Sequence, residues 1–73
     1  MYTYKLLLHS EPEGGFTVTV PALPGCITYG ENVTEAIEMA KEAIELYVEV
    51  LREKGEIIVD DSNTLEYSLN LAV

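Results

Sequence analysis

A chain of 73 residues has room for one domain, and 48% hydrophobic with 23% charged residues is typical of a globular protein. Four basic against 13 acidic residues give a net charge of −9, which argues against direct contact with nucleic acid, because binding to phosphates needs clustered Lys and Arg. The single cysteine, Cys26, excludes an intramolecular disulfide and a zinc site built from several cysteines.

The start of the chain lacks the basic and apolar regions of a secretory signal, and no apolar run approaches 18 residues. We therefore expect a cytoplasmic protein. The high negative charge favours a basic protein as partner, and it also increases the solubility of the chain. Because a chain of this size buries a modest share of its surface, self-association would add stability.

Two segments with alternating polarity open the chain, at residues 2–9 and 16–20. Residues 10–15, with the sequence Ser-Glu-Pro-Glu-Gly-Gly, have the composition of a hairpin loop. The two segments are therefore predicted to form an antiparallel hairpin.

A third, shorter strand is predicted at residues 26–29. Pro24 and Gly25 before it match the central pair of a type II turn. The strand ends at Gly30, just before the cap of a helix. Cys26, which follows Gly25, is expected to be a small buried thiol.

One long amphipathic helix is predicted at residues 33–54. Asn32 can cap its first turn together with Glu35, and Gly55 suits a left-handed stop after the cations of the last turn. Its apolar stripe recurs at three- and four-residue spacing and contains Val33, Ala36, Ile37, Ala40, Ala43, Ile44, Tyr47, Val48 and Leu51. The opposite side is mostly acidic.

Met39, Leu46 and Val50 widen the apolar arc beyond what packing on one sheet requires. Two explanations remain open. Either a loop or the C-terminal segment covers this flank, or the flank is a contact with a second copy or another partner.

Residues 65–73 alternate again and predict a last strand, after a polar loop at residues 60–63. The order β-β-β-α-β predicts one α+β domain over residues 1–73. A right-handed crossover through the helix gives a mixed four-stranded sheet of order 3-2-1-4, with the helix on one face and a Thr-rich, solvated surface on the other.

No catalytic, cofactor or metal site emerges from the residues. His9 is the only histidine and has no nucleophile paired with it in sequence. Asp60 and Asp61 lack the spacing of a calcium loop and are interpreted as solvated loop residues. The glycines match neither a Walker A nor a G-x-G-x-x-G pattern. The residues alone therefore indicate a small acidic binding module that is not an enzyme.

The run from Gly14 to Cys26, Gly-Gly-Phe-Thr-Val-Thr-Val-Pro-Ala-Leu-Pro-Gly-Cys, is followed by Gly30 and a helix that opens with Glu35-Ala36. This pattern resembles the HicB antitoxin family, whose motif is similar to G-G-Y-x-V-x-x-P-D-L-P-G-C. Phe16 replaces the usual Tyr, and Ala22 stands where Asp is common, which weakens any polar role for that turn.

The resemblance implies a partial RNase H-like fold and a part in a toxin-antitoxin system. Members of the family typically neutralise HicA, a small basic ribonuclease toxin, and often add a C-terminal DNA-binding domain. We expect this chain to hold the HicB-like domain without that addition, and hence to make no direct nucleic-acid contact.

Exposed acids of the helix are the expected toxin-binding residues: Glu38, Glu42, Glu45 and Glu49. For a homodimer or higher homo-oligomer, the expected contacts are Met39, Leu46 and Val50. One alternative is a solitary structural protein that self-associates and has no toxin partner. A degenerate RNase H-like nuclease is the other, and it is disfavoured because residues 4–8 offer no metal-binding carboxylate.

Overall fold

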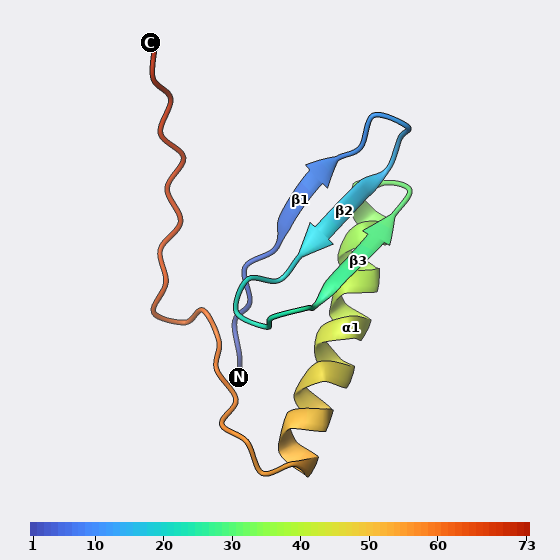
Figure 1. The fold of residues 1–73 in the computed structure, drawn as a ribbon, viewed down its shortest axis with the longest axis vertical. Helices are drawn as coiled ribbons and strands as arrows, with labels where there is room; N and C mark the ends of the chain where they lie inside the picture. Colours follow the sequence, from blue (N-terminus) through green and yellow to red (C-terminus); the bar gives the residue numbers. More distant parts are fainter.

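The computed structural model describes residues 1–73 and contains a three-stranded antiparallel sheet with one helix across one of its faces (Figure 1). The strands are β1 (Leu7–Ser10), β2 (Phe16–Thr19) and β3 (Ile27–Gly30), in the spatial order β1-β2-β3. The helix α1 (Val33–Glu53) packs chiefly against β3 and β2. The predicted α+β class and the order of the first three strands are confirmed.

The strand register decides which side chains face the helix. Val18 lies opposite Leu8 on β1 and Thr28 on β3, and it is completely buried beneath α1. Because side chains alternate along a strand, Leu7 and Ile27 belong to the uncovered face. They are 46% and 60% exposed, so this face is more apolar than the Thr-rich surface predicted from the sequence.

Small residues allow α1 to lie close to the sheet. Ala36 and Ala40 are fully buried and form one core cluster with Val18. Gly30 permits an even closer approach, because a Cβ added there would lie 2.3 Å from the backbone nitrogen of Ala36. A second cluster, formed by Val20, Leu23 and Cys26, packs beneath the C-terminal half of α1.

Both ends of α1 match the sequence signals. The side-chain oxygen of Asn32 accepts a hydrogen bond from the Glu35 amide at 2.9 Å. At the other end Gly55 has φ +70°, and its amide donates to the carbonyl of Arg52 at 3.0 Å. A residue in this left-handed conformation closes a helix by satisfying its last carbonyls. The helix ends at Glu53, one residue earlier than predicted.

The predicted fourth strand is absent from the sheet, so the order 3-2-1-4 is corrected to β1-β2-β3. Residues 56–73 contain neither strand nor helix. In Figure 1 the last part of the chain runs away from the body, on the side of β1. A turn causes this departure: the Thr64 amide donates to the carbonyl of Asp61 at 3.0 Å, and beyond Thr64 the backbone makes no bond to the rest of the chain.

The first strand is also shorter than predicted, because residues 3–5 pair with residues 60–61 instead of with β2. The amide of Asp61 donates to the carbonyl of Thr3 at 2.7 Å. β2 ends at Thr19, and the chain then turns at Pro21. Residues 2–6 of the first predicted segment therefore have no partner strand in β2. The single helix, α1, has no apolar stretch long enough to span a bilayer.

Candidate interaction surfaces

The two aspartates that the sequence places in a loop form a clamp that fastens residues 60–61 to residues 3–5. The Asp60 carboxylate accepts a hydrogen bond from the Thr3 amide at 2.9 Å, and the Asp61 carboxylate accepts one from the Lys5 amide at 2.8 Å. Asp61 is 9% exposed, so its interpretation as a solvated loop residue is wrong. These partners lie 56 and 57 residues apart, a separation at which no local sequence pattern indicates a contact.

The clamp is expected to weaken in acid. Hydrogen bonds from the Ser62 side chain and from the Thr3 amide lower the pKa of Asp60 below its ordinary value of 3.8. A carboxyl with a lowered folded-state pKa stabilises the fold above its unfolded pKa, and that contribution disappears as pH falls through the folded value. We expect the NMR shift of the Thr3 amide to titrate below pH 3.8. Asp60→Asn should abolish this titration, whereas Glu66→Gln, the control, should leave it in place.

The only histidine, His9, is exposed near the end of β1. No group of three His, Cys, Asp or Glu side chains lies close enough together to hold a metal ion. Two surfaces that involve α1 are candidates for contact with other molecules.

The first is the acidic row, defined as Glu38, Glu42, Glu45 and Glu49. The spacings of four, three and four residues place these carboxylates along one line of the helix, opposite the buried side marked by Ala36 and Ala40. All four are exposed. Like charges at this spacing repel one another, so a cationic surface laid against the row would relieve that repulsion.

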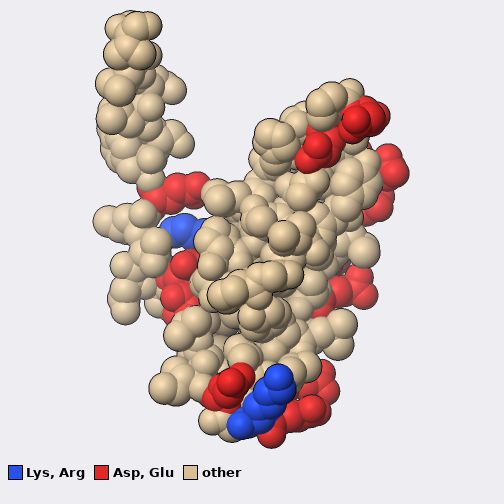
Figure 2. All heavy atoms as spheres, in the orientation of Figure 1, with Lys and Arg blue, Asp and Glu red and all other residues tan.

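The charge on the sheet side is sparse by comparison. Figure 2 shows the face with the sheet in front of the helix, and its centre is formed by uncharged side chains, with acidic groups gathered at the margins. The sequence has four Lys and Arg, and few basic side chains are visible on this face (Figure 2). α1 carries six of the 13 acidic residues and two of the four basic ones.

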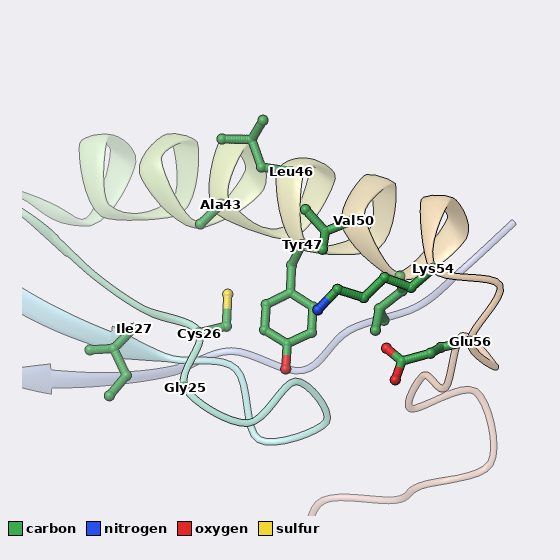
Figure 3. A pocket seen from close by; sticks show the side chains of 10 residues that line it. Gly25, Cys26, Ile27, Ala43, Leu46, Tyr47, Val50, Lys54 and Glu56 are labelled. Carbon is green, nitrogen blue, oxygen red and sulfur yellow. The ribbon is translucent and has the colours of Figure 1, made fainter.

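The second surface is the β3 groove, an apolar depression between the C-terminal half of α1 and the start of β3 (Figure 3). It encloses about 590 Å³. Its lining residues are Gly25, Cys26, Ile27, Ala43, Leu46, Tyr47, Val50, Leu51, Lys54 and Glu56. Lys54 and Glu56 supply the charged end of the groove, and the rest is mostly hydrocarbon.

A hydrogen bond, a buried side chain and a tight turn fix the residues at the base of the groove. The Tyr47 hydroxyl donates to the carbonyl of Pro24 at 2.7 Å, which joins the helix to the turn before β3. Cys26 is buried as predicted, and burial raises the pKa of its thiol. The positive φ of Gly25, +82°, gives the chain the tight turn that the Pro-Gly pair predicts.

The predicted apolar flank borders this groove. Leu46 is 65% exposed and Val50 46%, and both line it. Met39 is likewise exposed, nearer the start of α1. Of the two explanations for the flank, covering by the molecule's own loop or C-terminal segment is contradicted, because neither lies over it. The helical pattern identified these residues, but it could not reveal Cys26 and Ile27, which come from another element.

Comparison with known proteins assigns the chain to a family. Residues 4–71 match the family model described as HicB-like antitoxin of bacterial toxin-antitoxin system. The UPF0150 proteins of Thermoplasma acidophilum and Archaeoglobus fulgidus are 41% and 42% identical over 59 and 57 residues; these matches cover 81% and 75% of this chain and 86% and 83% of those proteins. Antitoxin HicB of Escherichia coli K12 is 38% identical over 55 residues, which is 75% of this chain and 40% of that protein.

Proposed function

Because the chain belongs to the HicB-like antitoxins of bacterial toxin-antitoxin systems, we propose that it neutralises a small basic ribonuclease toxin of the HicA type. The acidic row supports this proposal most directly. Four exposed carboxylates on one line of a rigid helix form a surface complementary to the cationic groove with which such a toxin holds RNA.

Neutralisation then works by covering the toxin's active site. The toxin must bind a polyanion, so its site is basic, and the acidic row competes for the same cationic side chains. Opposite charge accelerates the encounter of the two proteins and orients the helix toward the site. The antitoxin needs no chemistry of its own for this role.

An RNA-cleavage assay tests the proposal. The candidate toxin for this assay is any small basic protein encoded beside this chain, purified and supplied with a labelled RNA. We expect one equivalent of the antitoxin per toxin site to stop cleavage, and co-expression to restore growth of cells that produce the toxin. Undiminished cleavage at saturating antitoxin would overturn the proposal.

We propose in addition that the chain self-associates through the flank of Met39, Leu46 and Val50. All three side chains are more than 40% exposed, and Leu46 and Val50 also line the apolar groove, so they form more than a scatter of single surface hydrophobes. The alternative function, a solitary self-associating protein without a toxin, relies on this same surface. It would be favoured by a stable oligomer that binds no basic neighbour.

A further inference from the structure

Two of the apolar surfaces that the chain leaves uncovered can be matched to each other. One is the β3 groove. The other is the extended segment, residues 64–73, whose apolar row consists of Leu65, Tyr67, Leu69, Leu71 and Val73. Every member of this row is at least 69% exposed. Alternation of this kind is typical of a strand with one buried face, yet the segment has nothing to lie against.

The segment is long enough to run the whole length of the groove, and β3 offers it a free edge. Ten extended residues span roughly 33 Å. The groove follows α1 from Ala43 to Lys54, which is roughly 17 Å of helix. β3 borders the groove and has β2 as its only neighbour, so its other edge can pair with an added strand.

The segment of the same molecule starts at the wrong edge of the sheet to reach this groove. The chain passes the groove at Glu56, but the clamp then fastens Asp60 and Asp61 to residues 3–5, which lead into β1. β1 and β3 are the opposite edges of the sheet. Figure 1 shows the segment leaving on the side of β1, directed away from the molecule.

We propose that residues 64–73 of one copy lie along β3 in the groove of a second copy, with the apolar row against Leu46 and Val50. The second copy returns the same contact, so two molecules form a closed two-fold dimer. This proposal rests on the self-association proposed above, and it identifies residues 64–73 as the segment that covers Leu46 and Val50.

Charge favours this mode of contact over a face-to-face meeting of helices. Each copy carries a net charge of −9, and 12 of its 13 acidic residues lie outside the segment, which contains Glu66 alone. An exchanged segment can thus bury apolar surface while the acidic rows remain apart. Those rows also remain free to meet a basic protein.

The test measures the molar mass of the full chain by light scattering after gel filtration. We expect a dimer for the wild type, and a monomer for Leu69→Asp with Leu71→Asp, which adds charge to the apolar row. The matched control, Ser68→Asp with Asn70→Asp, adds the same charge to the other row and should stay dimeric. Because these side chains are exposed in the single molecule, the changes leave its fold intact.

The outcomes separate this proposal from simple self-association. A dimer that survives Leu69→Asp with Leu71→Asp but not Leu46→Asp with Val50→Asp would overturn the exchange and leave self-association standing. A monomeric wild type would overturn both, whether or not the chain still neutralises its toxin.

Disulfide mapping locates the segment directly. In a Cys26→Ala background, Leu69→Cys combined with Leu46→Cys or Val50→Cys should oxidise to a covalent dimer in at least one of the two pairings. The pairing of Leu69→Cys with His9→Cys on β1 should not oxidise. A bond to position 9, or none to either groove position, would contradict the proposal.

Discussion

Reversing two charges of the acidic row, Glu42→Lys with Glu49→Lys, is expected to weaken toxin binding about 30-fold. Each reversal replaces an attraction with a repulsion and costs about 1 kcal/mol at an exposed contact, and about 2 kcal/mol in total corresponds to that factor. The net charge changes from −9 to −5, since each substitution adds two charges. Isothermal titration with the purified toxin measures the affinity.

A matched control separates the position of the charges from their number. Glu13→Lys with Glu31→Lys also gives −5, but it acts in the hairpin loop and before the helix, away from the row. We expect this variant to lose less than a few-fold in affinity. Wild-type binding should weaken with added salt more steeply than binding by the row variant, because fewer opposite charges remain to be screened. Equal losses in the two variants would show that the row has no specific part.

Gly30→Ala is expected to cost about 3 kcal/mol of stability, the upper part of the range for an overpacked core. The added methyl group would lie 2.3 Å from the Ala36 nitrogen and 2.4 Å from its Cα. These are backbone atoms of α1, so no side chain can rotate to make room. A chain of 73 residues has a total stability of about 4–11 kcal/mol. Urea unfolding followed by circular dichroism, at constant protein concentration, measures the change.

Gly14→Ala is the control for this substitution. Gly14 has φ +107°, and nothing lies within 4 Å of a Cβ built there, so the substitution carries the backbone strain of a left-handed residue and no clash. We expect a loss of about 1 kcal/mol. A Gly30→Ala protein as stable as Gly14→Ala would mean that α1 does not approach the sheet as closely as described.

The features predicted well from the sequence are those determined by residues that are neighbours along the chain. Asn32 and Gly55 mark the ends of α1 because capping is decided within one turn of the helix. The hairpin of β1 and β2 is predictable because Gly14 and Gly15 adopt the positive φ values that its loop requires. The exposure of the acidic row follows in the same way from helical spacing.

The features that were missed depend on contacts between distant parts of the chain. Alternation in residues 64–73 predicts an extended segment with one apolar face, but it contains no information about which strand the segment meets. The turn at Asp61 and Thr64 directs the segment away from β1, and that turn is held by bonds to residues 3–5. The β3 groove likewise combines α1 with Cys26 and Ile27, which helical periodicity cannot connect.

NMR chemical-shift mapping of the labelled antitoxin, titrated with its toxin, tests the role of the acidic row most directly. The account predicts that the largest changes fall on Glu38, Glu42, Glu45 and Glu49 and their neighbours on α1, while Thr17 and Thr19, on the uncovered face of the sheet, keep their shifts. Changes concentrated on that face of the sheet, with α1 unperturbed, would contradict it.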